Sequence, residues 1–243
     1  RGSIFVYSDK CYENVETFYG YRESDRLGGV DPYSASKACA ELVISSYCRS
    51  YFCKPDYQHL NVASVRAGNV IGGGDFSENR LIPDYYRAFI SQKSMAIRHP
   101  DATRPWQHVL EPLSGYLYLG SALAQNQSLH GEAFNFGPSS NQNRTVMDLL
   151  DESYQYWNSK DAEAFCLPAS TNSFDEAGLL KLNCEKSDIV LGWKSNLDFS
   201  ETVRFVNEWY LEYFGGGVIE NVTKLQIDLF ESLAIKRKLK WTA

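Results

Sequence analysis

The stretch Ile4-Phe5-Val6-Tyr7-Ser8-Asp9-Lys10 is a short apolar run that ends in a hydroxyl, a carboxylate and an amine. The run predicts a buried β-strand, because its apolar and aromatic side chains follow one another without a helical period. In open α/β folds, ligands bind at the carboxyl ends of the strands. The stretch therefore predicts an α/β fold with a site at Ser8, Asp9 and Lys10.

A second motif lies downstream, where Tyr33-Ser34-Ala35-Ser36-Lys37 places a phenol and an ammonium four residues apart. On a helix this spacing puts both side chains on one face. The lysine charge favours phenolate over phenol, so the tyrosine can accept a proton near neutral pH. Pro32 suits a helix entry, and the pattern from Ala38 to Phe52 continues the helix. Such a pair is common on helix surfaces, but its position after the first strand favours a catalytic interpretation.

These two motifs resemble the extended short-chain dehydrogenase/reductase family, in which a Ser or Thr, a Tyr and a Lys form the catalytic triad. Ser8, Tyr33 and Lys37 match these three positions. The resemblance implies part of a doubly wound, Rossmann-like parallel sheet with a smaller α/β substrate domain. It also implies NAD as the cofactor, with Tyr33 and Lys37 contacting it.

Further strings, in the expected order, are similar to the CDP-D-glucose 4,6-dehydratases within that family. They are Ser8 to Tyr12, Val65 to Asp75, Arg80 to Asp84, Arg104 to Leu113 and Asn135 to Pro138. Related dTDP-glucose dehydratases carry an acidic residue where Lys10 stands, so Lys10 favours the CDP branch. The resemblance implies NAD-dependent dehydration of CDP-D-glucose to CDP-4-dehydro-6-deoxy-D-glucose, in deoxysugar and O-antigen precursor synthesis.

The implied reaction gives each motif residue a role. Tyr33 would take the proton of the C4 hydroxyl as hydride leaves that carbon, with Ser8 hydrogen-bonding the oxygen and Lys37 holding the ribose. Asp9 would protonate the departing C6 hydroxyl, which requires a protonated carboxyl. Lys10 would either remove the C5 proton as a neutral amine or stabilise the enolate by its charge.

Substrate contacts follow from the same resemblance. Arg104 offers a planar fork for the diphosphate, and Arg80 adds a second charge. The remaining expected substrate residues are Asn69, Leu81 and His108.

Three further residues leave alternatives open. Arg66 suits either a substrate contact or, since it lies inside a strand pattern, a buried structural ion pair. Trp106 suits either a core position or a platform for base stacking. Glu111 suits either the start of a helix or a contact to the ribose.

Composition excludes several classes of function. The chain has 243 residues, of which 44% are hydrophobic, and a net charge of −6, so it has no general attraction for nucleic acid or anionic membranes. No segment approaches the roughly 20 apolar residues of a membrane span, and no signal peptide is visible. The six cysteines form no C-x-x-C pair and the four histidines are scattered, which predicts a cytoplasmic protein without a metal.

The organisation follows from pattern and resemblance. The sequence contains no strand, glycine-rich turn and helix of the kind that opens a dinucleotide-binding fold. By resemblance, we expect the chain to begin near the fifth strand of the sheet, with the first half of that domain missing. Residues 1–70 are then the C-terminal part of the NAD-binding domain, with returns near 110–135, and 71–243 mainly the substrate domain.

Periodicity predicts the remaining elements. Strands are expected over 62–66, 95–98, 133–136, 163–166 and 179–183. Helices are expected over 81–91, 109–126, 145–158, 199–214 and 225–239, with Thr145 capping the third of these and Asp148 three residues on.

Two other functions and an assembly state are also considered. A nucleotide-sugar epimerase would share Ser8, Tyr33 and Lys37 but would not need the pair Asp9-Lys10. A chain without its cofactor half could also be a non-catalytic remnant. The helix from Tyr33 to Phe52 carries apolar side chains on more than one face, and family members pair through it, so we expect a homodimer.

Overall fold

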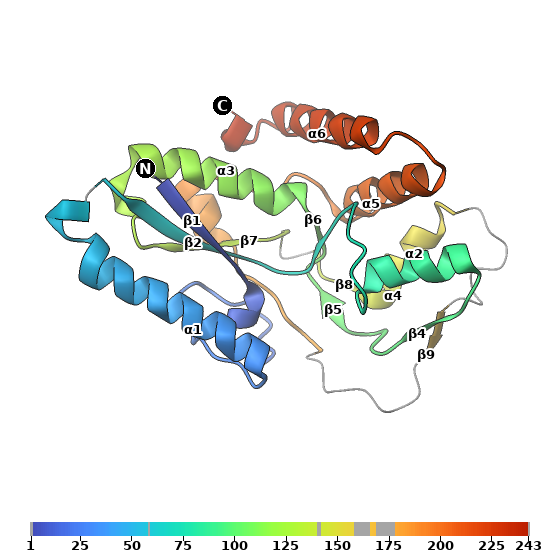
Figure 1. Cartoon of the computed structure of the whole chain (residues 1–243), viewed down its shortest axis with the longest axis horizontal. Helices are drawn as coiled ribbons and strands as arrows, with labels where there is room; N and C mark the ends of the chain where they lie inside the picture. Colours follow the sequence, from blue (N-terminus) through green and yellow to red (C-terminus); the bar gives the residue numbers. More distant parts are fainter. Residues whose placement is uncertain (1, 58, 140–141, 158–165, 169–177, 243) are drawn as a thin grey trace.

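A parallel three-stranded sheet forms the centre of the fold (Figure 1). The computed structural model describes residues 2–57, 59–139, 142–157, 166–168 and 178–242. The strands lie in the order β1 (Gly2–Ser8), β2 (Asn61–Ala67) and β7 (Ala133–Phe136). Their carboxyl ends meet, because Ser8 pairs with Ala67 and Ala67 with Phe136. The predicted α/β fold, with residues 4–7 and 62–66 in one sheet, is confirmed.

Two helices cover opposite faces of this sheet, α1 (Pro32–Tyr47) and α3 (Leu110–Gln125) (Figure 1). Successive strand residues face opposite sides. Ala63 and Val65 of β2 therefore join the apolar core beneath α3, whereas Ser64 and Arg66 face α1 and bond to it. The sheet is apolar toward α3 and polar toward α1.

Helix α1 begins with an N-cap residue, Asp31, followed by Pro32 in its first turn. The Asp31 carboxylate accepts hydrogen bonds from Ser34 N at 3.0 Å and Ser34 Oγ at 2.6 Å. A cap of this kind satisfies backbone N–H groups that have no partner within the helix. The helix passes into a π-helical turn, Cys48–Phe52, so the predicted helix of residues 33–52 is confirmed.

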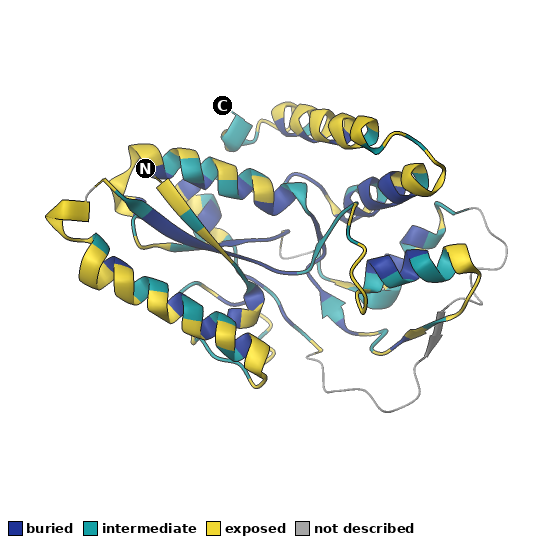
Figure 2. Ribbon diagram, in the orientation of Figure 1, coloured by how far each residue is buried: buried dark blue, intermediate teal, exposed yellow. Residues whose placement is uncertain are grey.

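A second lobe is built from α2 (Leu81–Ser91), α4 (Val146–Tyr154) and α5 (Phe199–Phe214) around an aromatic core. Tyr86 and Tyr210 stack at its centre, with ring centroids 3.9 Å apart. Figure 2 shows buried positions concentrated in these packed faces, while the outer surfaces of α1 and of α6 (Ile219–Lys236) are exposed.

Short strand pairs lie outside the central sheet. They are β3 (Val70–Ile71) with β6 (Gln107–His108), β4 (Met95–Ile97) with β9 (Cys166–Pro168), and β5 (Thr103–Arg104) with β8 (Arg144–Thr145). Among the described residues, no helix combines the length and apolar character that crossing a bilayer requires.

Two of the expected strands differ from the structure. Residues 179–183 form isolated bridges instead of a strand, because Leu179 pairs with Thr103 and Leu182 with Tyr21. The segment thus changes partner within a few residues. Of the expected strand 163–166, residues 163–165 lie outside the described part of the chain, and β9 begins at Cys166.

Glu111, in the first turn of α3, is a buried structural carboxylate. It is 1% exposed and accepts hydrogen bonds from the backbone N–H groups of Asn196, at 3.1 and 2.9 Å, and Leu197, at 2.5 Å. Burial raises the pKa of Glu111 to about 7, although these hydrogen bonds oppose the rise. Of the two alternatives for Glu111, the structure supports the helix-start carboxylate.

The raised pKa predicts a pH-dependent stability. Because the folded-state pKa lies above the ordinary value of 4.5, the contribution of Glu111 is greatest at low pH and decreases as pH rises through about 7. Between pH 5 and 8 the unfolding free energy should lose up to about 3 kcal/mol from this group, at 1.4 kcal/mol per pKa unit. Glu111→Gln should remove this slope in urea unfolding.

The matched control is Glu220→Gln, which alters an exposed pair with Lys224 on α6. It should leave the pH dependence of the parent unchanged. If the unfolding free energies of the parent and of Glu111→Gln changed in parallel between pH 5 and 8, Glu111 would be ionised across this range and the prediction would be wrong.

Candidate active site

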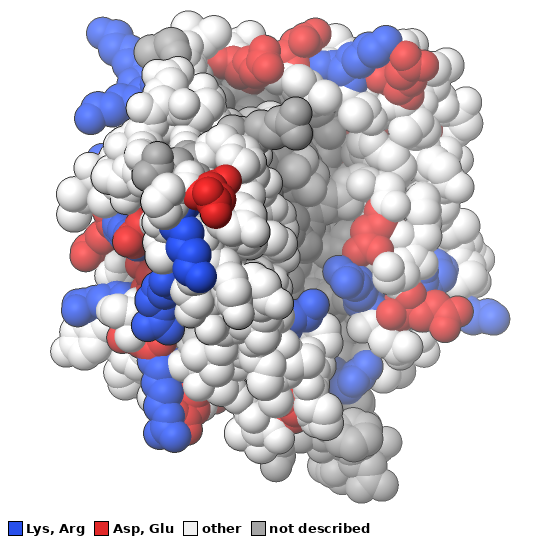
Figure 3. Space-filling view, turned by 60° about the vertical axis from the view of Figure 1, so that its left-hand side comes forward, with Lys and Arg blue, Asp and Glu red and all other residues white. Residues whose placement is uncertain are grey.

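A cleft of about 520 Å³ lies between the carboxyl edge of the sheet and the second lobe. It collects most of the site residues predicted from the sequence. Those that line it are Ser8, Asp9, Lys10, Tyr33, Asn69, Arg80, Leu81 and Arg104. Figure 3 shows Lys and Arg interspersed with Asp and Glu on one side of the molecule, without a continuous surface of one sign.

Two predicted residues lie outside the lining. Lys37 is one helical turn from Tyr33, with its Nζ 5.1 Å from the Tyr33 ring centroid. His108 is 2% exposed, its ring lies edge-on to Phe205, and its Nδ1 accepts a hydrogen bond from Leu110 N at 3.3 Å. Burial lowers the pKa of His108 to about 4, so the imidazole is neutral. The pairing of β6 with β3 thus places His108 in the interior instead of the cleft.

Ser8 and Asp9 form a hydrogen-bonded pair where β1 ends. Ser8 caps the single turn Asp9–Cys11 by accepting from Lys10 N at 3.2 Å, and its Oγ donates to Asp9 Oδ1 at 2.9 Å. Asp9 is 2% exposed, and its Oδ2 has no hydrogen-bond partner among the described residues. Burial raises the pKa of Asp9, against the opposing effects of Ser8, Lys10 and Arg104. A protonated carboxyl is suited to general acid chemistry.

Gly68 makes the burial of Asp9 possible. A Cβ atom at residue 68 would overlap Asp9 Oδ2, so only glycine allows the carboxyl to lie against this backbone. The Gly68 carbonyl accepts from Gln107 Nε2 at 3.0 Å, and the same amide donates to Phe136 O at 3.1 Å. Sequence reasoning missed Gly68 and Gln107, and the one signal for Gly68 was a glycine directly after a strand.

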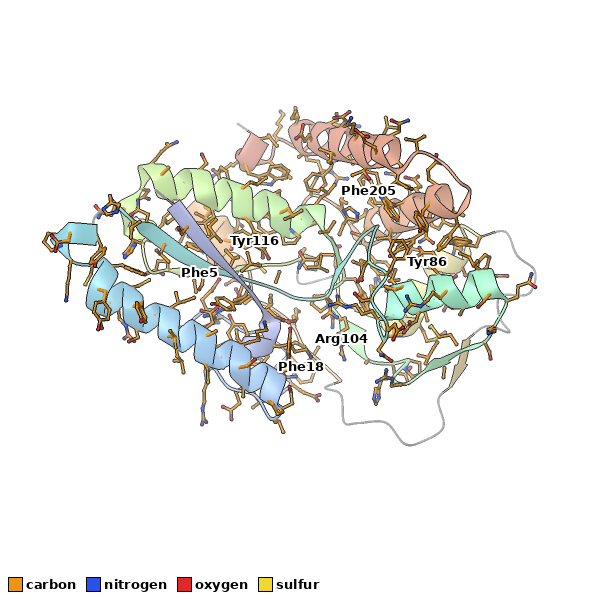
Figure 4. The ribbon with its side chains drawn as sticks, in the orientation of Figure 1. Phe5, Phe18, Tyr86, Arg104, Tyr116 and Phe205 are labelled. Atoms are coloured by element: carbon orange, nitrogen blue, oxygen red, sulfur yellow. The ribbon has the colours of Figure 1, made fainter. Side chains whose placement is uncertain are left out.

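Arginine side chains supply positive charge to the cleft. Arg104 is 7% exposed, and its Nη1 donates to the carbonyls of Thr103, at 2.9 Å, and Gly178, at 3.3 Å. Figure 4 shows Arg104 between the sheet and the lobe that carries Tyr86. The Arg80 side chain is more exposed, and its Nη1 lies 3.5 Å from Asp75 Oδ2. A buried guanidinium and an exposed one suit an anionic ligand.

The chemistry available is acid–base catalysis beside an anion site. Tyr33 is 56% exposed and presents its phenol to the cleft. Tyr33 and Lys37 share one face at the start of α1, with Tyr33 exposed and Lys37 half-buried, and this pair could hold the nicotinamide end of a dinucleotide. Within the described ranges, no group of three or more His, Cys, Asp or Glu side chains could hold a metal ion.

Comparison of the sequence with known proteins identifies a family and a relative of this chain. Residues 3–137 match the model of the NAD dependent epimerase/dehydratase family. The chain is 44% identical over 218 residues to the CDP-glucose 4,6-dehydratase of Salmonella typhimurium, covering 89% of this chain and 60% of that protein. The chain therefore spans about three fifths of the length of this relative.

Solved structures show the same fold. A dTDP-glucose 4,6-dehydratase from Streptomyces venezuelae, solved with NAD bound, superposes with a TM-score of 0.71 at 22% identity, covering 89% of this chain and 62% of that one. A UDP-glucuronic acid 4-epimerase from Bacillus cereus gives a TM-score of 0.72 at 14% identity, covering 88% and 62%. These matches confirm the predicted Rossmann-like architecture.

The Asp9–Gly68 contact yields a direct test. In Gly68→Ala the new methyl group should push the Asp9 carboxyl toward the cleft, where hydration lowers its pKa relative to the parent. The overpacked site should also cost about 1–3 kcal/mol of stability. Carbon-13 NMR titration of the Asp9 carboxyl carbon measures the first effect, and thermal unfolding measures the second.

Gly120→Ala is the matched control, because a Cβ there would meet Ile4 Cδ1 at an ordinary 3.5 Å. It should leave the titration of Asp9 unchanged. An unaltered Asp9 titration in Gly68→Ala would show that the close approach does not control this carboxyl.

Proposed function

The chain belongs to the NAD-dependent epimerase/dehydratase family, and from that premise we propose that it carries the catalytic cleft of a CDP-D-glucose 4,6-dehydratase. The observation that carries the proposal is the buried Asp9 carboxyl beside Lys10, in the same cleft as Ser8 and Tyr33. Dehydration needs an acid for the leaving hydroxyl, whereas oxidation alone does not. The 44% identity to a CDP-glucose 4,6-dehydratase supports the same substrate.

NAD, held by Tyr33 and Lys37, would supply the acceptor for hydride from C4 of the sugar and the donor that returns hydride to C6. Tyr33 Oη takes the proton of the C4 hydroxyl, and Ser8 Oγ hydrogen-bonds that oxygen. The resulting C4 ketone makes the neighbouring C5 proton acidic. The residues of the chain then act on C5 and C6.

Elimination uses the turn after β1. Asp9 Oδ2, which has no other hydrogen-bond partner among the described residues, holds the proton that converts the C6 hydroxyl into water. Lys10 removes the C5 proton or stabilises the enolate by its charge. Burial raises the pKa of Asp9, which favours the protonated form that a general acid needs.

Binding uses the opposite wall of the cleft. The Arg104 guanidinium, oriented by two carbonyls, presents its fork to the diphosphate. Arg80 and Asn69 complete the positive and polar wall, and Leu81 contributes an apolar contact. Asn69 holds a left-handed backbone conformation, with φ of 48°, which Asn tolerates better than most residues.

The proposed assembly is a homodimer through α1. Its outward surface exposes Leu42, Val43 and Tyr47, and the π-helical turn after it exposes Tyr51; each of these side chains is more than half exposed. An apolar surface of this kind marks an interaction site. No disulfide involves Cys11, Cys39, Cys48, Cys53 or Cys184, in keeping with the reducing cytoplasm that we propose as its location.

An epimerase is the competing function. It would use Ser8, Tyr33 and Lys37 and would leave the acid at Asp9 without a task. A desolvated carboxyl is costly to maintain, and its retention in the cleft favours dehydration.

Two variants of the intact enzyme separate oxidation from elimination. Asp9→Asn keeps the size of the side chain but removes the acid, so oxidation at C4 should survive while loss of water slows about 100-fold or more. Tyr33→Phe should abolish both steps. Rapid-mixing spectra should show transient NADH in the Asp9 variant and none in the Tyr33 variant. Dehydration at the parent rate by Asp9→Asn would assign this carboxyl a structural role.

The diphosphate contact is tested by Arg104→Lys. An ammonium keeps the charge but cannot form two parallel hydrogen bonds, so KM for CDP-glucose should rise about 10-fold or more, a loss of about 1.4 kcal/mol, with a smaller change in kcat. Steady-state kinetics measure both. Arg98→Lys is the control at another cleft residue, and an equal rise in KM there would contradict a specific role for Arg104.

A further inference from the structure

Helix α1 has little apolar contact with the sheet that it covers. Within α1, which the structure describes in full, the buried residues are Ser34, Ala38 and Glu41. The large apolar side chains Leu42 and Val43 are more than half exposed instead. Large side chains therefore contribute little to the packing of this helix on the sheet, and its buried contact with β2 is polar.

That contact is a buried ion pair between α1 and β2. Arg66 Nε donates to Glu41 Oε1 at 2.8 Å, and Arg66 Nη2 donates to Glu41 Oε2 at 3.1 Å. Ser64 Oγ adds a hydrogen bond to Glu41 Oε2 at 2.9 Å. Each charged side chain is 4% exposed. Two parallel bonds between planar groups restrict distance and orientation together.

The same guanidinium also donates hydrogen bonds to residues that follow the turn Asp9–Cys11. Arg66 Nη1 donates to Tyr12 Oη at 2.7 Å and to the carbonyl of Glu23 at 3.2 Å. Tyr12 comes directly after the turn Asp9–Cys11, and its hydroxyl donates to Asn135 Oδ1 on β7 at 2.8 Å. The guanidinium also lies over the Tyr12 ring, 4.9 Å from its centroid.

Helix geometry connects this pair to the cleft. Tyr33, Lys37 and Glu41 are spaced by four residues, so they follow one face of α1. Glu41 lies about two turns from Tyr33, roughly 12 Å along the axis. Since a helix is stiff over two turns, a shift at Glu41 is transmitted to the phenol.

We propose that Glu41 and Arg66 are positioning residues, whose buried pair sets where Tyr33 and Lys37 on α1 stand relative to Ser8 and Asp9 on the turn after β1. The inference rests on the proposed function, since it concerns the two halves of that catalytic group. Arg104 and Asn69 belong to other elements, so the pair affects turnover more than substrate binding.

The test uses Glu41→Gln and Arg66→Lys in the intact enzyme. A misplacement of about 1 Å costs on the order of 100-fold in rate, so kcat should fall 10- to 100-fold while KM for CDP-glucose changes less than about twofold. Hydrogen exchange, which needs no activity, should accelerate in the amides of α1 but remain as in the parent in those of β7.

Ser64→Ala keeps the test falsifiable where the first variants unfold. It removes one hydrogen bond to Glu41 and leaves the ion pair, so it should reproduce the same pattern with a kcat loss of about two- to fivefold. Leu123→Ala is the structural control, because Leu123 is a buried residue of α3, which covers the opposite face of the sheet. It should lower thermal stability without changing kcat or the exchange of α1.

The outcomes separate the two claims. Variants at Glu41, Arg66 and Ser64 that lower kcat no more than Leu123→Ala does at the same loss of stability, with α1 exchange unchanged, would overturn the positioning role. A parent enzyme that does not dehydrate CDP-glucose would overturn the proposed function, while faster exchange confined to α1 would still support the positioning role.

Discussion

The buried ion pair between Arg66 and Glu41 is the interaction on which the arrangement of this protein depends. It joins the polar face of β2 to a helix whose buried residues are Ser34, Ala38 and Glu41. Removing one partner of such a pair leaves a buried charge and typically costs about 3–5 kcal/mol. The apolar face of the same strand packs beneath α3. Strand β2 therefore packs against α3 on its apolar face and orients α1 through the ion pair on its polar face.

The cleft depends on a second close contact, between the Asp9 carboxyl and the backbone of Gly68. Burying a carboxyl without a full set of hydrogen bonds is unfavourable, and Asp9 retains one unpartnered oxygen in the described structure. The same burial raises its pKa. In the proposed reaction, the feature that costs stability is thus the one that supplies the proton donor, while Arg104 on the opposite wall would provide the charge for an anionic substrate.

Local signals predicted local structure well. The helix over residues 81–91 has the observed bounds, and the Thr145 cap with Asp148 forms a reciprocal capping box, because capping involves residues three positions apart. The motif residues Ser8, Asp9, Lys10 and Tyr33 do line one cleft. The position of Arg66, a charged residue inside a strand pattern, also indicated a buried ion pair.

Long-range contacts could not be predicted in the same way. Nothing near Gly68 in the sequence indicates that its carbonyl meets Gln107, or that Asp9 presses against it. His108 was expected in the cleft, but the β3–β6 pairing turns it toward Phe205. Residues 179–183 alternate like a strand yet take two different bridge partners. Each of these outcomes is decided by tertiary partners, and periodicity carries no information about them.

The central claim is that this cleft performs oxidation and elimination on one sugar, with hydride returned within the active site. The most direct measurement uses CDP-glucose that carries deuterium at C4, incubated with the intact enzyme, and locates the label in the product by NMR and mass spectrometry. The account predicts a 4-keto-6-deoxy sugar with deuterium at C6. Recovery of the label at C4 of an epimerised sugar, or its loss from the sugar altogether, would contradict it.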